Sequence, residues 1–385
     1  MIVPISSGLR PISCMRRSHH RLGAIDVTLL SILYILSWVA AEWCWFQREQ
    51  RATAILKRNY GVWVHADVFV PGPAMDLREL GRGRLYLPVR SANIHDAAVD
   101  DGMWEQLLCF RYLDWLAFRD CRIEPCADFP IDALSRLKDL TFSNTTLTID
   151  NVRRISRLRH IESLTLRGVG LKGDWLEPLS ALANLNSLEL YNVDLTEVAT
   201  DSLARMKGLI VLQLSNVKVN SELWPALAEL GELEGLVIKG TPFDDEGMRH
   251  LVRLRKLRAL YLVDTTISDA GMASLAQLPN LCRLSLDGNN VGDAGLRHLL
   301  QLPRLQALDI SRTRATNACL RGLASMPTLK IVLVEGTSIS PSAPGFVGVC
   351  DTDGSVWYPN EARRKEIEEY SEPDDGSGDE TGNPR

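Results

Sequence analysis

Hydrophobic residues recur at a fixed interval of 24 residues through the central part of this chain. One column of this repeat holds Leu140, Leu164, Leu188, Leu212, Leu236, Leu260, Leu284, Leu308 and Val332. A second apolar column follows two residues later, and a third begins at Leu147. No insertion breaks the register, and nine complete units fill residues 115 to 330. The chain therefore contains a long array of equal structural units.

Each unit combines two periodicities. The L-x-L pair alternates apolar and polar positions and predicts a short strand, whereas the later apolar columns are spaced like one face of a helix. A polar column ahead of the helical stretch predicts N-terminal caps at Asp245, Asp269, Asp293 and Asn317. A proline column predicts where helices have ended, at Pro279, Pro303 and Pro327. Stacked units of this kind predict an α/β solenoid, with parallel strands on a concave face and helices on a convex face.

The unit also resembles a known family. Residues 260 to 281 read L-x-L-x-x-T-x-I-S-D-A-G-M-x-x-L-x-x-L-P-x-L, which resembles the leucine-rich repeat with a helical outer face. The resemblance covers about 115 to 340 and implies a horseshoe-shaped solenoid that binds proteins. Several units depart from the pattern, because valine replaces the usual Asn or Thr after the strand at Val169, Val193 and Val217. The buried polar column is expected to be discontinuous there.

The amino-terminal segment indicates a membrane. A basic stretch, residues 1–26, precedes an apolar span from Val27 to Phe46, which would be about 30 Å long as one transmembrane helix and would match a bilayer core. This front end resembles the membrane-anchored leucine-rich-repeat proteins of planctomycetes. A basic start favours a single-pass protein with its repeats on the extracytoplasmic side. A signal peptide cleaved before Glu42 and a soluble apolar helix remain alternatives.

The regions that flank the repeats have patterns of their own. Residues 47–114 predict a juxtamembrane helix, an edge strand near 62–70 and an irregular first unit. The strand of that unit is Leu85-Tyr86-Leu87, which lies too far ahead of Leu116 for one regular repeat and therefore implies an insertion. Residues 341–359 predict a hairpin cap. The formal net charge of −5 belongs to the tail, because residues 361–385 hold nine acidic and four basic residues. Residues 360–385 are therefore expected to be a disordered acidic tail.

Candidate chemistry is sparse. Gly168-Val-Gly-Leu-Lys-Gly173 matches a dinucleotide-binding spacing, but Gly168 shares a column with other turn glycines and a unit of 24 residues has no room for that fold. Cys121 and Cys126 are close enough in sequence to bridge, and the spacing does not decide whether they do. No Ser, His and Asp or Cys and His set has a positional reason to converge. We therefore expect no enzyme, no metal site and no cofactor.

The concave face remains as the candidate site. Side chains at the polar strand positions, or just after the strands, are not needed to fill the hydrophobic core and can contact a ligand. They are Arg167, Glu189, Tyr191, Gln213, Ser215, Lys239, Tyr261, Val263, Asp287, Asp309 and Arg312. Tyrosines among charges are typical of protein-binding patches, and the mixed signs disfavour nucleic acid. The sequence predicts a membrane-anchored module that binds a protein or peptide. A secreted or periplasmic binder, an intracellular adaptor that presents substrates to an enzyme, and a solvated face without a ligand are the alternatives.

Overall fold

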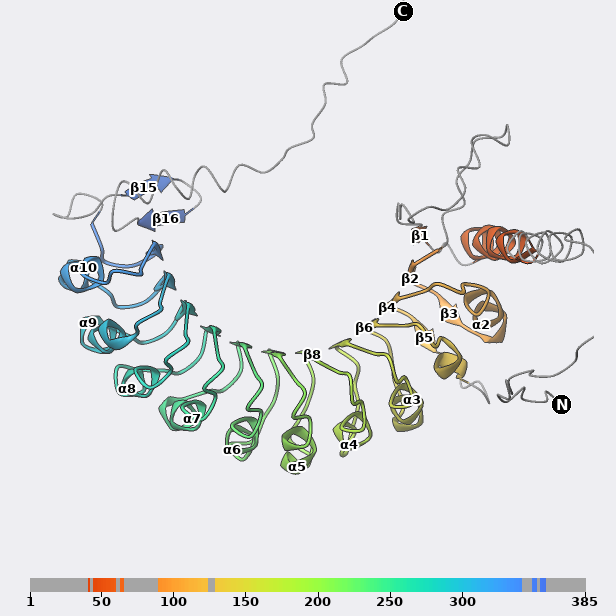
Figure 1. Cartoon of the computed structure of the whole chain (residues 1–385), viewed down its shortest axis with the longest axis horizontal. Helices are drawn as coiled ribbons and strands as arrows, with labels where there is room; N and C mark the ends of the chain where they lie inside the picture. Colours follow the sequence, from red (N-terminus) through yellow and green to blue (C-terminus); the bar gives the residue numbers. More distant parts are fainter. Residues whose placement is uncertain are drawn as a thin grey trace, which may run out of the picture.

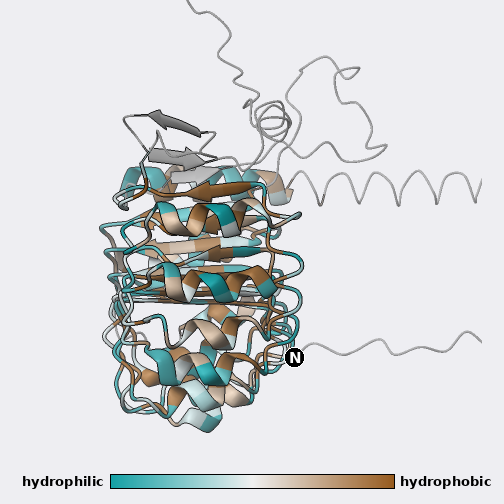
Figure 2. Ribbon diagram, turned by 90° about the vertical axis from the view of Figure 1, so that its left-hand side faces the viewer, coloured by the Kyte–Doolittle hydropathy of each residue, from teal (hydrophilic) through white to brown (hydrophobic). Residues whose placement is uncertain are grey.

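The computed structural model describes residues 41, 44–59, 63–65, 89–123, 129–340, 348–351 and 354–357. Their backbone follows an arc, in which the strands line the inner curve and the helices line the outer curve (Figure 1). The predicted arrangement of strands on a concave face and helices on a convex face is confirmed. The helices that face the viewer in Figure 2 carry hydrophobic and hydrophilic residues side by side, as a helix with one buried face requires.

One sheet runs through the whole arc. Its described parallel strands keep the regular repeat register and are β2 (Ser91–His95), β4 (Trp115–Arg119), β6 (Asp139–Ser143), β7 (Ser163–Arg167), β8 (Ser187–Tyr191), β9 (Val211–Ser215), β10 (Gly235–Lys239), β11 (Ala259–Val263), β12 (Arg283–Ser285), β13 (Ala307–Asp309) and β14 (Ile331–Leu333). Antiparallel strands cover both ends. β1 (Trp63–His65) pairs with β2, and the hairpin of β15 (Gly348–Asp351) and β16 (Gly354–Trp357) pairs with β14.

Short helices form the convex layer. They are α2 (Asp101–Leu107), η2 (Pro130–Ala133), α3 (Ile149–Ile155), α4 (Leu176–Leu179), α5 (Thr200–Ala204), α6 (Leu223–Leu227), α7 (Asp245–Leu251), α8 (Met272–Leu275), α9 (Asp293–Leu296), η3 (Arg297–Gln301) and α10 (Asn317–Ala324). A small second sheet, β3 (Ala98–Val99) with β5 (Arg122–Ile123), links the first two units between the layers. Pro279, Pro303 and Pro327 all follow the ends of helices, as predicted.

The apolar columns form one continuous core between the two layers. Leu212, Leu236 and Leu260 lie next to one another on adjacent strands and have no exposed surface. At the amino-terminal end the core becomes aromatic, because the Phe118 ring stacks on Phe142 with centroids 5.2 Å apart. Stacking units thus buries apolar surface that no single unit could bury alone.

A buried polar column after the strands is interrupted where the sequence predicted it. Asn289, 4% exposed, donates its amide to three backbone carbonyls and accepts from the Thr265 hydroxyl. Thr241 accepts from the Val217 amide and donates to the Lys239 carbonyl. The intervening column positions of the first half, Val169, Val193 and Val217, are buried apolar residues. The repeat interfaces there rest on apolar packing.

The predicted helix caps are wrong. Asp245, Asp293 and Asn317 are the first helical residues of α7, α9 and α10, and the cap positions belong to the residues before them. Asp269 lies before α8, whose cap position is Gly271. Asp244 accepts from the Gly247 amide at 3.0 Å, and Thr316 accepts from the Ala318 amide at 3.2 Å. A side chain that already has helical backbone geometry is not in the Ncap position from which it would accept its own helix's orphan amides.

The acidic column instead ties each repeat to the next. Its side-chain oxygens accept backbone amides from the following repeat, in the pairs Asp245 with Ser268 (2.9 Å), Asp269 with Gly292 (2.7 Å), Asp293 with Thr316 (2.9 Å) and Asn317 with Ser340 (2.8 Å). The chain between residues 245 and 340 therefore carries a ladder of side-chain bonds between neighbouring turns. The spacing of the column was predicted correctly, and the hydrogen-bond partner was not.

This ladder predicts a measurable loss of stability on Asp293→Ala. Asp293 accepts from both the amide and the hydroxyl of Thr316, at 2.9 and 2.6 Å. Removing both bonds is expected to lower the free energy of unfolding by about 1–2 kcal/mol. Asp293→Asn keeps an acceptor for the amide and should lose less, as measured by urea denaturation. Equal losses in the two variants would contradict the role of the ladder.

The first unit differs from the prediction. β2 begins one regular repeat before β4, and Ala92 pairs with Leu116 while Ile94 pairs with Phe118. The expected insertion is therefore wrong, and Leu85-Tyr86-Leu87 lies outside the described residues. The small side chain of Ala92 in the leucine column hid this strand from pattern reading.

Most of the predicted membrane segment lies outside the described residues, as do residues 1–26 and 360–385. Within the described part of the chain, no helix is both long and apolar enough to cross a membrane. Residues 44–59 are helical, and Ala52 and Leu56 on this helix are buried against the core of the repeats. Cys121 is a free, buried thiol, and its suggested partner Cys126 is not among the described residues.

Candidate functional site

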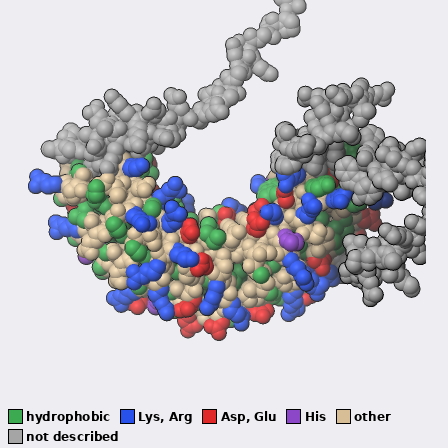
Figure 3. Space-filling model, in the orientation of Figure 1, with side chains coloured by type: hydrophobic (Ala, Val, Ile, Leu, Met, Phe, Trp, Pro, Cys, Tyr) green, Lys and Arg blue, Asp and Glu red, His purple; other side chains and the backbone are tan. Residues whose placement is uncertain are grey.

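The predicted site residues line the inner curve of the arc, from β7 to the turn after β13. The buried leucines of each strand point toward the helices, so the alternate side chains face the hollowed side of the molecule (Figure 3). We call this surface the concave face, defined by the outward positions of β4 to β14. The predicted residues on it fall into three regions of different chemistry.

At the first region, Tyr191 is held between two charged neighbours. The Arg167 guanidinium lies 3.9 Å from the centroid of the Tyr191 ring, and the Tyr191 hydroxyl donates to the Glu189 carboxylate at 3.0 Å. Burial raises the pKa of the Tyr191 phenol, and the nearby Glu189 charge raises it further. The phenol therefore stays a neutral hydrogen-bond donor at physiological pH. The structure brings these three predicted residues together as one cluster.

The middle region is largely apolar. Val237 and Tyr261 are neighbours on β10 and β11, and Val263 lies at the end of β11. Val211 on β9 is 36% exposed, which is unusual for a large apolar side chain in this array. Gln213 donates to the Ser215 hydroxyl at 3.1 Å, and Lys239 is exposed. We call the set Val211, Val237, Tyr261 and Val263 the apolar strip.

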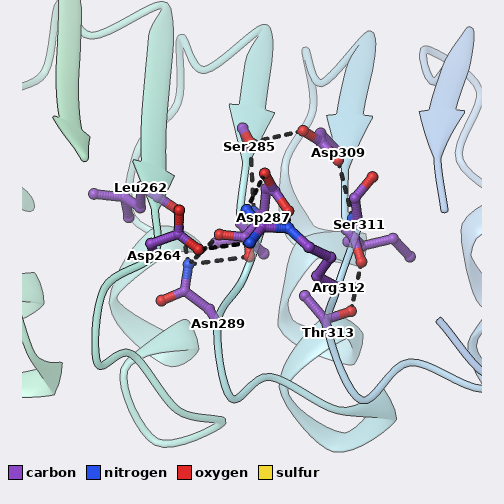
Figure 4. Close-up of polar contacts among 11 residues, drawn as sticks. Leu262, Asp264, Ser285, Asp287, Asn289, Asp309, Ser311, Arg312 and Thr313 are labelled. Carbon is purple, nitrogen blue, oxygen red and sulfur yellow. Dashed lines mark hydrogen bonds and ion pairs between the residues drawn. The ribbon is translucent and has the colours of Figure 1, made fainter. Parts of the chain in front are cut away.

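The third region contains an arginine, Arg312, whose side chain is held by two carboxylates. Arg312 donates to both carboxylate oxygens of Asp287, at 2.7 and 2.6 Å, and lies 2.9 Å from Asp264 (Figure 4). These two carboxylates raise the pKa of the Arg312 guanidinium. Arg312 has a φ of 53°, in the left-handed region that disfavours a large side chain. The ion pairs hold an arginine in a turn column that elsewhere contains Asp, Asn and Gly.

Asp309 has a different environment. It accepts from the buried Ser285 hydroxyl at 2.9 Å and from the Ser311 amide at 3.0 Å (Figure 4). No cation pairs with Asp309 among the described residues. The carboxyl-terminal end of the concave face therefore presents a carboxylate that is positioned but not neutralised.

The sequence analysis missed a hollow beside Arg167. A shallow space of about 470 Å³ is lined by Arg119, Asp120, Thr141, Ser143, Thr165 and Arg167, on β4, β6 and β7 and the turn after β4. We call it the arginine hollow. The repeat register contained the signal, because Ser143 and Arg119 precede Arg167 in the same column.

A second hollow lies at the turns that follow β7, β8 and β9. It includes Gly170 and Gly173 of the Gly168–Gly173 motif, with Asp194, Glu197 and Lys218. The Gly173 amide donates to the Glu197 carboxylate at 2.8 Å, so it is not available to a phosphate. All three glycines of the motif have positive φ angles, as turns require. The geometry fits a turn and leaves the dinucleotide hypothesis without support.

Comparison with known families decides the classification. A family model described as a leucine-rich repeat region matches residues 88–341, which is more than half of the chain. The chain belongs to the leucine-rich-repeat family. A comparison with curated protein sequences finds no match.

Solved leucine-rich-repeat structures share the fold at low identity. An internalin from Listeria monocytogenes is 17% identical, with a TM-score of 0.47, over 65% of this chain and 82% of that one. The ectodomain of the Arabidopsis thaliana receptor kinase GASSHO1/SCHENGEN3, in complex with CASPARIAN STRIP INTEGRITY FACTOR 2, is 15% identical with a TM-score of 0.41. It is matched over 64% of this chain and 35% of that chain. The mouse RP105/MD-1 complex is 19% identical with a TM-score of 0.50, over 65% and 47%. This chain spans less than half the length of the matched chains in the Arabidopsis and mouse structures.

The leucine-rich-repeat array offers no catalytic constellation in its described part. No three His, Cys, Asp or Glu side chains gather there as a metal site would require. The surface features that distinguish this array follow one another along the concave face. They are the arginine hollow, the tyrosine cluster, the apolar strip and the carboxylates near β13.

Proposed function

We propose that this leucine-rich-repeat protein binds another protein or a peptide through its concave face. Leucine-rich-repeat domains are protein-interaction modules, and the surface of this one has the composition of a binding site. The observation that carries the proposal is the apolar strip, in which Tyr261 and its valine neighbours face outward on a surface flanked by charges. Apolar and aromatic side chains with polar surroundings are typical of protein interfaces.

We also propose that the array is anchored in a membrane by residues 27–46, with the repeats on the extracytoplasmic side. The support is the uncharged run from Val27 to Ala41, the tryptophans near its end and the basic residues before it. An anchored binder would present its concave face to partners at the membrane surface. The alternatives are a secreted form that begins at Glu42 and an intracellular adaptor.

Replacing Tyr191 and Tyr261 with Ala tests the binding function. Proximity labelling with the full-length chain in native membranes is expected to identify a partner that the double variant loses. Both side chains lie on the surface of the sheet, so the melting temperature should change little. Leu300→Ala is the matched control, because Leu300 is 42% exposed on η3 of the convex face.

The same experiment separates the alternatives. Partners retained by the double tyrosine variant would move the site away from the concave face. A chain recovered from the soluble fraction with Glu42 as its first residue would contradict the membrane anchor and favour a secreted binder. Labelled proteins confined to the cytosolic side would favour the adaptor.

A further inference from the structure

The charges of the concave face are distributed unevenly along the arc. At the carboxyl-terminal end, the Arg312 guanidinium is neutralised by Asp264 and Asp287. At the amino-terminal end, Arg119 and Arg167 form no ion pair with any described residue, although both are exposed. The arginine hollow therefore holds two guanidinium groups that pair with no carboxylate of the described residues.

Hydroxyl groups that can donate hydrogen bonds lie between these two arginines in the hollow. The strand register places Ser143 between Arg119 and Arg167, and Thr141 beside Thr165 in the adjacent row. The hydroxyls of Thr141, Ser143 and Thr165 make no hydrogen bond within the described structure, whereas the buried Thr145 hydroxyl takes part in three. Two guanidinium groups, the Asp120 carboxylate and three uncommitted hydroxyls face one space of about 470 Å³, so the net charge of its lining is positive.

Nearby carboxylates accept hydrogen bonds from neutral donors and keep their charge, as Asp309 does. Asp120, which borders the hollow, accepts from the Asn144 amide at 2.9 Å. Glu189 accepts from Tyr191 at 3.0 Å. Arg167 keeps its guanidinium over the Tyr191 ring, which orients the cation without neutralising it.

We propose that the arginine hollow binds carboxylate side chains of an acidic, extended segment of the partner protein. This inference rests on the proposed function and names the chemistry of the partner. Arg119 and Arg167 are two strand spacings apart, or about 10 Å. That separation matches residues three apart in an extended polyproline II chain, which rises about 3.1 Å per residue and brings every third side chain to the same side. Guanidinium groups pair with carboxylates through two parallel hydrogen bonds, and the hydroxyls supply further donors.

The arrangement also orients the segment. Beyond the hollow, the concave face continues through Tyr191 to the apolar strip and then to Asp309, which no described cation neutralises. The acidic end of the segment therefore lies over β4 to β7, and the residues that follow place apolar side chains on Val237 and Tyr261. A segment in the reverse direction would set its carboxylates against Asp309.

The test uses the full chain and a fluorescein-labelled peptide of four Glu-Ser-Ser repeats, which carries a carboxylate at every third residue. Fluorescence anisotropy compares the wild type with Arg119→Gln/Arg167→Gln. The matched control is Arg297→Gln/Arg321→Gln, which removes the same charge from exposed convex positions. The concave variant is expected to bind at least tenfold more weakly, the control within twofold of wild type, and a Gln-Ser-Ser peptide not measurably. Arg119→Lys/Arg167→Lys should give intermediate affinity, because lysine lacks the paired donors.

Several outcomes would overturn the assignment. They are equal binding by the wild type and the concave variant, no binding by the wild type, or equal or tighter binding of a thymidylate oligonucleotide. Binding that appears only when the acidic residues of 361–380 are changed to amides would make the chain's own tail the occupant. If partner capture depends on Tyr261 but not on Arg119 and Arg167, the proposed function stands and this inference fails.

Discussion

Leu236→Asp is expected to abolish the cooperative unfolding transition of the repeat array. Leu236 is fully buried in β10 between Leu212 and Leu260. Losing the apolar side chain costs about 2–5 kcal/mol, and burying a carboxylate without a partner costs several kcal/mol more. That sum is comparable with the stability of a typical domain, about 5–15 kcal/mol. Thermal melting followed by circular dichroism measures the loss.

Val237→Asp is the matched control for this substitution. Val237 is the next residue of the same strand, but its side chain faces the concave surface and is only partly buried. The carboxylate remains hydrated there, so the melting transition should persist with a modest shift. A cooperative and unchanged transition in Leu236→Asp would contradict the assignment of the leucine column to the core. Loss of the transition in both variants would show that β10 tolerates no charge on either face.

Asn289→Ala is expected to lower the free energy of unfolding by about 3 kcal/mol. The Asn289 amide donates to the carbonyls of Leu262, Leu286 and Asp287, and its oxygen accepts from Thr265. The substitution leaves these groups without their partner in a site that excludes water. Urea denaturation with a two-state fit measures the difference.

Asn290→Ala provides the control in the adjacent position. Asn290 is exposed, and only its backbone takes part in the hydrogen bonds described for it. Its substitution should change the free energy of unfolding by less than about 0.5 kcal/mol. Similar losses at 289 and 290 would show that the turn conformation, not the buried amide network, determines stability.

Much of the fold could be predicted because every unit repeats the same packing requirement. Columns such as Leu140 to Val332 are apolar in each row, since each must fill the same place between strand and helix. A single short apolar run could be a strand or part of a helix, but nine such runs at the same spacing identify a repeated strand. The first strand escaped notice because Ala92 fills the leucine position with a small side chain, which weakens the apolar signal without changing the backbone register.

Side-chain partners were harder to predict than positions. Asp245 and Asp293 stand one residue after the cap positions, and only the three-dimensional path of the chain shows that the amide they accept from belongs to the next repeat. The arginine hollow was missed for a related reason. Arg119 and Arg167 lie two repeats apart in sequence, and they share a space only because the register returns the chain to the same column after every turn.

The left-handed turn column has a consequence for how such a chain can change length. At Asp96, and then at every twenty-fourth residue to Gly336, the backbone makes the same turn, with φ between 49° and 73°. Deleting or duplicating one whole unit, for example residues 187–210, would join two ends that already have this geometry. The inner surface can thus be shortened or extended in increments of one strand spacing, about 4.8 Å, without redesign of the neighbouring units. Insertion or loss of any other number of residues would break the register at every later column.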